Sequence, residues 1–316
     1  MGAVAEDEAR QSAGSPAPCR KGCEVLTSSS LTRFAPAPTG YLHLGHVLNA
    51  HYVWNLARRS GARVLLRIED HDLERCKSEY ETAILDGLDW LGFAPDIFPT
   101  SAFRAGRCDG RQSDRHHIYQ TAAQDLAARG LLYGCSCSRR EIAAAQEDPA
   151  SMSASINDEL RYAGTCRDRG LGLGDDFAWR LRIEPGIEAF DDLILGQQTQ
   201  DPAVQCGDVA IRDRKGNWTY QFVAAVDDSR QGIDLVVRGR DLLASTGRQI
   251  RIARLLGRDT PASFAHHELI MKSPAQKLSK SDGDTGVRDL RAAGWTKEQV
   301  LAAALPKNSS SPSTFM

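Results

Sequence analysis

RFAPAPTGYLHLGH, residues 33–46, is a turn rich in proline and glycine that leads directly into a segment with helical periodicity. The LTRF segment that overlaps its start, residues 31–34, is typical of a short buried strand, and from Gly45 onward apolar residues recur at four-residue spacing. RVLLRIED, residues 63–70, predicts a second buried strand. Strand, helix and strand within about forty residues form a βαβ unit, which predicts an α/β fold with a Rossmann-like, doubly wound parallel sheet.

The remainder of the chain continues this pattern with one interruption. Ser78 and Glu81 predict a capping box at the start of a helix. Residues 133–169 are rich in Cys, Ser, Ala and Asp and show little strand pattern, so we predict an insertion there. We expect the strands of the parallel core to resume at FAWRLRIE, residues 177–184, and DVAIRD, residues 208–213.

Two further strands complete the predicted sheet, IDLVVRG at residues 233–239 and FAHHELIM at residues 264–271. Thr296 and Gln299 predict a capping box for a small C-terminal helical element. We therefore divide the chain into a disordered N-terminal tail (1–30), a first half of the Rossmann core (31–132), the insertion (133–169), a second half of the core (170–305) and a disordered C-terminal tail (306–316).

Composition restricts the class of protein. The chain has 316 residues, 41% of them hydrophobic, and a formal net charge of −2, so it can fill a core and is not a polycation that coats nucleic acid. No bilayer-length apolar run and no signal peptide are visible, so we expect a cytoplasmic monomer with no membrane partner. Nucleic acid would have to bind a local patch. Arginines gather at residues 238–254, although such a helix face is often merely solvated.

Two short motifs indicate a function only when they are taken together. His43 and His46 in the first are compatible with simple helix capping, and KLSKS, residues 277–281, is by itself typical of a charged surface loop. The first motif lies at the first strand-to-helix turn, and the second follows the last predicted core strand. In this order and separation they resemble the two signatures of class I aminoacyl-tRNA synthetases.

The resemblance extends over about residues 31–305 and is to the glutamyl branch of that family in particular. Besides the two signatures, it rests on RIEDHD (67–72), YQFVAAVDD (220–228) and VVRGRDLLASTGRQ (236–249). The chain departs from the family pattern at three positions, Ala37, Leu278 and Gly247, where serine, methionine and proline are frequent. None of these departures removes a charged group, but Ala37 removes one hydroxyl that could contact a substrate.

The resemblance implies that an amino acid is activated by ATP, with Mg, as its α-carboxylate attacks the α-phosphate and pyrophosphate leaves. Negative charge develops on oxygens in such a reaction, so positioning and positive charge suffice and no protein nucleophile is needed. The family motifs assign ATP binding to His43, Gly45 and His46, at a helix N-terminus that favours anions, and to Lys280. Lys277 and Lys280 would assist catalysis from the KLSKS loop, and both histidines are part of the catalytic assignment.

The same resemblance implies a binding site for glutamate. The matching motifs assign substrate contacts to Arg33, Ala35, Ala37, Glu69, Tyr220 and Arg238. Two guanidinium groups suit the two carboxylates of glutamate, while a carboxylate and a phenol suit its ammonium group. Structural alternatives are an ion pair of Arg238 with Asp241 and a contact of Glu69 with Arg67.

Eight cysteines in a chain without an export signal suggest reduced thiols or metal ligands rather than disulfides. Cys135 and Cys137, with the distant Cys166, could by themselves be buried thiols. Short glutamyl-type enzymes bind zinc at this position through Cys-x-Cys followed by Tyr-x-x-x-Cys. The resemblance therefore implies a structural zinc ion held by Cys135, Cys137, Tyr162 and Cys166, across a segment that is longer than typical.

The sequence ends at residue 316, soon after KLSKS, without the large helical region that reads the anticodon in glutamyl-tRNA synthetases. It therefore resembles a shortened branch of stand-alone catalytic cores that attach glutamate to queuosine in the anticodon loop of tRNA(Asp). The expected partners are ATP, L-glutamate and tRNA(Asp) bearing queuosine. Two alternatives stay open. One is a truncated enzyme that charges a tRNA 3′ end, alone or with a separate anticodon-binding partner, and the other is an inactive tRNA-binding relative.

Overall fold

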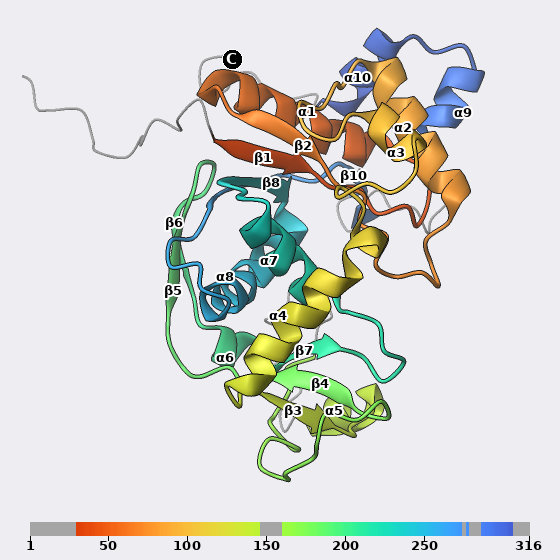
Figure 1. Ribbon diagram of the computed structural model, residues 1–316. Coiled ribbons are helices and arrows are strands. Elements are labelled where there is room, and N and C mark those ends of the chain that lie inside the picture. Colours follow the sequence, from red (N-terminus) through yellow and green to blue (C-terminus); the bar gives the residue numbers. More distant parts are fainter. Residues whose placement is uncertain (1–29, 146–159, 274–275, 278–285, 306–316) are drawn as a thin grey trace, which may run out of the picture.

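The computed structural model describes residues 30–145, 160–273, 276–277 and 286–305. Within these residues the strands form a six-stranded sheet, a three-stranded sheet and a two-stranded ribbon. The strands β1, β2 and β8 of the large sheet lie in the upper half of Figure 1, and the small sheet lies at the bottom. The helix α4 (His116–Ala128) runs from one toward the other.

The large sheet contains five parallel strands and one antiparallel edge strand. Their order is β2 (Arg63–Leu66), β1 (Leu31–Phe34), β8 (Leu235–Gly239), β9 (Ser263–His267), β5 (Glu188–Asp192) and β6 (Gly196–Gln200). Among the described strands of this sheet, β5 and β6 pair antiparallel and all the other pairs are parallel. The predicted βαβ unit is confirmed, because α1 (Leu44–Ser60) connects β1 to its parallel neighbour β2.

Most of the remaining helices are short. They are α2 (Ser78–Leu91), α3 (Thr100–Arg104), α5 (Arg139–Ala144), α6 (Pro202–Gln205), α7 (Tyr220–Arg230), α8 (Thr246–Leu255), α9 (Val287–Ala292) and α10 (Lys297–Ala304), with the 3-10 turns η1 (Gln112–Arg115) and η3 (Arg240–Ser245). No helix among the described residues is both long and apolar enough to cross a bilayer.

The two predicted capping boxes have different outcomes. The one at Thr296 and Gln299 is confirmed, since each side chain accepts the backbone N–H of the other residue. The one at Ser78 and Glu81 is wrong. The carbonyl of Lys77 already accepts the first helical N–H groups, so Ser78 is the first residue of α2 rather than its cap.

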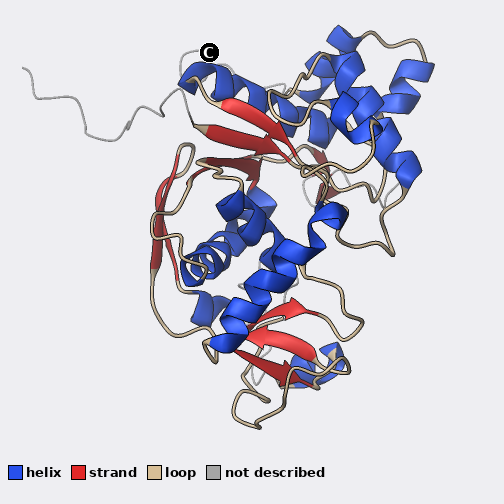
Figure 2. Ribbon diagram, in the orientation of Figure 1, coloured by secondary structure: helices blue, strands red, loops and turns tan. Residues whose placement is uncertain are grey.

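Side chains of the parallel strands alternate between two buried faces, as expected for a sheet that helices cover on both sides. Leu66 and Val237 belong to a core that includes residues of α1, α2 and α10. Leu65 and Val236, their neighbours in sequence, belong to a separate core that includes Ile250 of α8. Figure 2 shows α1 on one side of the sheet and the α7–α8 pair on the other.

The small sheet corrects the predicted strand assignment. It consists of β3 (Leu132–Cys135), β4 (Ala178–Leu181) and β7 (Val209–Arg212), all antiparallel. FAWRLRIE and DVAIRD therefore do not join the parallel core. The boundary expected after residue 169 falls between β3 and β4, inside the small sheet. Periodicity identifies a strand but not its partner, and here Leu181 and Ile211 pack in their own core with residues of α4 and α7.

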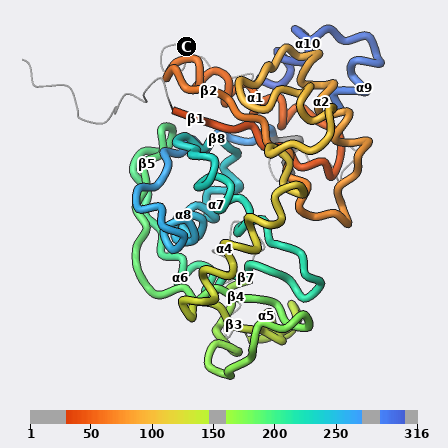
Figure 3. Tube along the Cα trace, viewed as in Figure 1, coloured from red at the N-terminus to blue at the C-terminus, as the bar shows by residue number. Residues whose placement is uncertain are grey.

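The chain leaves and rejoins the small sheet between β4 and β7. It adds the β5–β6 hairpin to the edge of the large sheet and returns through α6, a path that can be followed in Figure 3. The hairpin thus connects the small sheet to the carboxyl ends of the parallel strands.

Candidate active site

The two histidines of the first motif cap α1. Nδ1 of His43 accepts the N–H of Gly45 at 3.1 Å, and Nδ1 of His46 accepts the N–H of His43 at 3.1 Å. The capping that we considered as a structural alternative is therefore present. It is compatible with binding an anion, because a neutral ring whose Nδ1 accepts a hydrogen bond carries its proton on Nε2, where it can be donated.

Gly45 lets the His43 ring fold back over the start of the helix. A Cβ at this position would lie 2.9 Å from Cε1 and 3.0 Å from Nδ1 of His43, so a larger residue would displace the ring. The chain after KLSKS returns to the same place. Gly286 forms a bridge with His43, and the N–H of Val287 donates to the carbonyl of Leu42 at 2.7 Å. Gly286 and Val287, which follow the second motif in the sequence, therefore lie beside the first motif.

The two predicted lysines lie at the limit of the described residues. The backbone of Lys277 belongs to β11 (Gln276–Lys277), which pairs with β10 (Met271–Ser273). Lys280 lies outside the described residues. The roles of both lysines stay predictions from the family motif.

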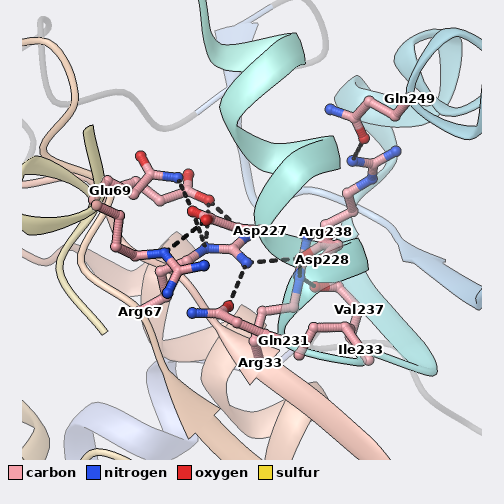
Figure 4. Close-up of polar contacts among 12 residues, drawn as sticks. Arg33, Arg67, Glu69, Asp227, Asp228, Gln231, Ile233, Val237, Arg238 and Gln249 are labelled. Atoms are coloured by element: carbon pink, nitrogen blue, oxygen red, sulfur yellow. Dashed lines mark hydrogen bonds and ion pairs between the residues drawn. The ribbon is translucent and has the colours of Figure 1, made fainter. Parts of the chain in front are cut away.

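Buried charges gather at the carboxyl ends of β1 and β2 (Figure 4). Nε of Arg33, on β1, donates to Asp228 of α7 at 3.0 Å, and Arg67 donates to the same carboxylate at 2.7 Å. Arg67 also pairs with Glu69, with 2.9 Å between the charged atoms. We use the term charge cluster for Arg33, Arg67, Arg115, Arg238, Glu69, Asp227 and Asp228, in which Arg115 pairs with Asp227 at 2.8 Å.

Arg238 differs from the other arginines of the charge cluster, because its hydrogen bonds within the described residues go to uncharged groups. Nε donates to Nε2 of His266 at 3.0 Å, and the terminal nitrogens donate to Gln249 at 2.6 Å and to Thr246 at 2.9 Å. The residue is only 3% exposed. Burial lowers the pKa of its guanidinium, and the charge of Arg33 lowers this pKa further. A carboxylate bound here would stabilise this cation.

The charge cluster has four arginines and three carboxylates, and the next buried carboxylate, that of Asp192, is separated from Arg238 by the ring of His266. The neighbouring His266 and Tyr220 do not change this balance near neutral pH. Burial lowers the pKa of His266, and it raises the pKa of Tyr220, so both side chains are uncharged. A ligand carboxylate at Arg238 would give this guanidinium a negative charge in direct contact, which its partners His266, Gln249 and Thr246 do not supply.

The remaining predicted substrate residues surround the same place. Tyr220 begins α7 and is hydrogen-bonded to Arg238, and the nearby Glu69 carboxylate contributes to the raised pKa of Tyr220. The turn that contains Ala35 and Ala37 lies beside Glu69, because the carbonyl of Pro36 accepts the N–H of Glu69 at 3.1 Å. The structure therefore brings the six predicted glutamate residues, Arg33, Ala35, Ala37, Glu69, Tyr220 and Arg238, close together.

Part of this arrangement is not predicted by the sequence motifs. They assign no role to Asp227 or Asp228, and Arg67 enters only as a structural partner of Glu69, a contact that is present. The two adjacent acidic residues in the otherwise apolar segment YQFVAAVDD could have indicated buried ion pairs, because buried carboxylates are almost always paired. The alternative of an ion pair between Arg238 and Asp241 is not found among the side-chain hydrogen bonds of Arg238 with described residues, which go to His266, Gln249 and Thr246.

A polar cavity of about 430 Å³ adjoins Tyr220. Its wall combines the loop after β2 (His71, Asp72, Glu74 and Arg75), Arg139 of α5, and Asp213, Lys215, Asn217, Trp218 and Thr219 between β7 and α7. Lys215 and Glu74 form an exposed ion pair of 2.9 Å that joins the last of these segments to the first. The cavity thus lies between the large sheet's loops and the small sheet.

The cysteines predicted to bind metal also lie together. The sulfur atoms of Cys135, Cys137 and Cys166 are within 4.8 Å of one another, and the hydroxyl of Tyr162 lies 3.4 Å from Sγ of Cys135. Burial alone would raise the pKa of Cys166, but hydrogen bonds with Ser136 and Tyr162 lower it to about 6. Sulfur atoms around a tetrahedral zinc ion are about 3.8 Å apart, close to the 3.5 Å between Cys137 and Cys166.

The arginines of residues 238–254, for which the sequence left both a local nucleic-acid patch and a solvated helix face open, differ in exposure and in their contacts. Arg238 and Arg248 are buried. Arg251 and Arg254 both pair with Glu188 of β5, so their charges hold α8 against the hairpin. Arg240, which pairs with Glu268, and Arg254 stay partly exposed, with side-chain exposed fractions of 51% and 42%.

Comparison with known proteins identifies the family. Residues 30–305 match the tRNA synthetases class I (E and Q), catalytic domain. The chain belongs to this family. A glutamyl-Q tRNA(Asp) synthetase from Cupriavidus metallidurans is 41% identical over 254 residues, which cover 79% of this chain and 77% of that protein. Another from Rhodobacter capsulatus is 37% identical over 282 residues, which cover 85% and 98% of the two chains.

A solved structure agrees with the fold. The glutamate tRNA ligase from Elizabethkingia meningosepticum, in complex with its amino acid, superposes with a TM-score of 0.64 at 27% identity. The match covers 84% of this chain and 53% of the ligase, so this chain spans about half the length of that protein. The predicted α/β synthetase fold and the predicted resemblance are therefore confirmed.

We expect Asp228→Asn to lower the free energy of unfolding by about 3–5 kcal/mol near neutral pH, because two buried arginines lose their shared carboxylate. These arginines hold the pKa of Asp228 well below its usual range, although burial alone would raise it. Its contribution is therefore complete above the unfolded pKa of about 3.9 and is lost as pH falls below that value. Urea unfolding across this range checks both statements.

Asp86→Asn is the matched control, because Asp86 pairs with Arg104 on the surface, where its side chain is 57% exposed. It should change stability by less than about 0.5 kcal/mol. A loss of similar size in the two variants would contradict the role given to Asp228.

Proposed function

We propose that this chain activates L-glutamate with ATP and magnesium and transfers the glutamyl group to queuosine in the anticodon loop of tRNA(Asp). The observation that carries the proposal is the buried guanidinium of Arg238, which donates to uncharged acceptors and lies beside Arg33, Glu69 and Tyr220. Free glutamate has two carboxylates and one ammonium group, hence a net charge of about −1 near neutral pH. Glutamine has an uncharged amide in place of the side-chain carboxylate and would leave Arg238 without a charged partner in direct contact.

In this proposal Arg238 and Arg33 bind the two carboxylates of glutamate. Glu69 and the hydroxyl of Tyr220 accept hydrogen bonds from its ammonium group, and the backbone at Ala35 and Ala37 closes the pocket. The hydrogen bonds of Arg238 to neutral acceptors support this assignment, because they hold the guanidinium in place without cancelling its charge.

Activation would take place at the start of α1. The Nε2–H groups of His43 and His46 donate to phosphate oxygens at a helix N-terminus, where the dipole already favours anions. Lys277 and Lys280 add positive charge to the phosphates as pyrophosphate leaves. Magnesium bound with ATP supplies further neutralisation of the phosphate charge. The return of the chain to His43 at Gly286 supports a shared site for the two motifs.

The acceptor nucleoside would enter the polar cavity beside Tyr220. Bases in single-stranded loops can be unstacked and read by proteins, and the diol of queuosine resembles the ribose diol at a tRNA terminus. Two properties support this placement: the cavity adjoins a residue assigned to glutamate, and its wall is mostly polar. The two relatives named glutamyl-Q tRNA(Asp) synthetase support queuosine as the acceptor. We also propose that the chain acts as a monomer.

A zinc ion is the metal that best fits the cysteine cluster. We propose that Cys135, Cys137, Tyr162 and Cys166 bind it in a tetrahedral arrangement that stabilises the small sheet. The close approach of three sulfur atoms from two separate segments supports a metal centre. Tyr162 is the least usual ligand, since burial and the contact with Cys135 raise its pKa above the ordinary value.

We expect glutamate, without tRNA, to support exchange of pyrophosphate into ATP, and glutamine to be at least about 100-fold poorer in kcat/KM. Lys280→Ala should lower kcat by about 100-fold or more, because it removes a charge that stabilises the transition state. Lys297→Ala is the control, since Lys297 is 52% exposed on α10, and it should leave the rate unchanged. Equal kcat/KM for glutamine and glutamate would contradict the assignment of the glutamate-binding residues.

We expect labelled glutamate to be transferred to tRNA(Asp) that contains queuosine and not to the same tRNA without the modification. The labelled RNA is digested, and the nucleoside that carries glutamate is identified by mass spectrometry. Label on the terminal adenosine, or transfer to tRNA(Glu), would contradict queuosine as the acceptor and favour a truncated enzyme that charges the 3′ end. Pyrophosphate exchange without any transfer to RNA would contradict the acceptor assignment alone.

The purified protein should contain about one zinc ion per chain, as measured by elemental analysis. Cys135→Ser and Cys166→Ser should each remove most of this zinc, while Cys108→Ser, which changes a buried cysteine in the other core, should retain it. Tyr162→Phe should bind zinc more weakly in competition with a chelator. Full zinc content in both ligand variants would show that the metal is held elsewhere.

A further inference from the structure

Three side chains form a row across neighbouring parallel strands at their carboxyl ends. Asp192 ends β5, His266 lies on β9, and Arg238 of β8 stands opposite His266 in the strand register. Oδ2 of Asp192 is 2.5 Å from Nδ1 of His266, and Nε2 of the same ring is 3.0 Å from Nε of Arg238. The exposed fractions of the three residues are 4%, 0% and 3%, so water does not compete for these bonds.

The hydrogen bonds in this row determine where the protons lie. Burial alone would raise the pKa of Asp192, but its contacts with His266 and with the N–H groups of Ile194 and Leu195 lower it. Burial lowers the pKa of His266, so its ring is neutral. An ionised carboxylate can only accept, so the single ring proton lies on Nδ1. Nε2 is therefore an acceptor, and it binds the N–H of Arg238.

We infer that His266, oriented by Asp192, is a positioning residue that holds Arg238 for the substrate carboxylate while leaving its charge uncancelled. The inference rests on the proposed function, since it requires that Arg238 binds glutamate. A carboxylate in direct contact with Arg238 would hold the guanidinium equally well, but it would compete with the substrate for the same positive charge. The neutral ring of His266 is oriented by Asp192 and lies between that carboxylate and Arg238. It therefore keeps the negative charge of Asp192 out of direct contact with the guanidinium.

The groups around His266 make this arrangement sensitive to pH. Asp192 on β5 favours the charged ring, while Arg238 on β8 and the adjacent His267 disfavour it. Thr246, at the start of α8, contributes only an uncharged hydroxyl 3.2 Å from Nε2. Protonation of the ring would place an N–H donor against the N–H of Arg238. Glutamate should therefore bind more weakly as pH falls below the ordinary histidine pKa of about 6.5.

The test measures KM for glutamate, KM for ATP and kcat in pyrophosphate exchange, between about pH 5 and pH 8. His266→Met removes the acceptor and should raise KM for glutamate about tenfold or more, with KM for ATP unchanged. His266→Gln should stay within about threefold of the natural chain, because its amide oxygen can accept from Arg238, and it should lose the rise in KM at acid pH. Asp192→Asn should behave like His266→Met, because its amide would donate to Nδ1 and move the ring proton to Nε2.

Asp208→Asn is the matched control. Asp208 is also a buried carboxylate that accepts a backbone N–H and contacts an arginine, but it lies beside the small sheet. It should lower the melting temperature as Asp192→Asn does, without raising KM for glutamate. If Asp192→Asn and Asp208→Asn change KM equally, or if His266→Met and His266→Gln are indistinguishable, the positioning role is wrong. If the natural chain shows no glutamate-dependent exchange, the proposed function fails, and the inference fails with it.

Discussion

The carboxylate of Asp228 is the contact on which the arrangement of the candidate site depends. It joins Arg33 on β1 and Arg67 after β2 to the helix α7, and these elements are separated by more than half of the described chain. Each guanidinium is almost completely buried, so the loss of the shared anion would leave two cations without adequate solvation. The network therefore fixes the relative positions of the first half of the core and α7. The predicted substrate residues are distributed over these same elements.

Asp228, Asp227 and Glu69 contact arginines of the charge cluster other than Arg238, whereas Arg238 is linked to the carboxylate of Asp192 only through His266. The uncharged partners of Arg238 orient its guanidinium without removing its attraction for an anion. A buried cation without an anion in contact lowers the stability of the ligand-free protein. Residues that lower stability in this way are expected at functional sites. The guanidinium is already ordered in the folded protein, so a carboxylate can bind it without a further loss of side-chain entropy.

The two ends of the proposed site differ in how they are built. At the start of α1, two histidines cap the helix through bonds that span two or three residues, and Gly45 provides the space that the His43 ring needs. At Arg238, the supporting residues come from β5, β9 and α8 and meet only through the order of strands in the sheet. The β5–β6 hairpin thus has a second role, because it brings Asp192 to the edge of the site.

The sequence by itself determined the features that depend on short separations. The βαβ unit, the helix start at LHLGH and the capping box at Thr296 all follow from residues within a few turns of one another, and the three cysteines that the motifs selected lie together in the structure. Only the tertiary structure decided which strands pair. It assigned β4 and β7 to a separate antiparallel sheet, paired Arg251 and Arg254 of α8 with Glu188, and assembled the charge cluster. The physical reason is that periodicity encodes which side of an element is buried, whereas strand order and charge pairing depend on contacts between segments that are distant in the chain.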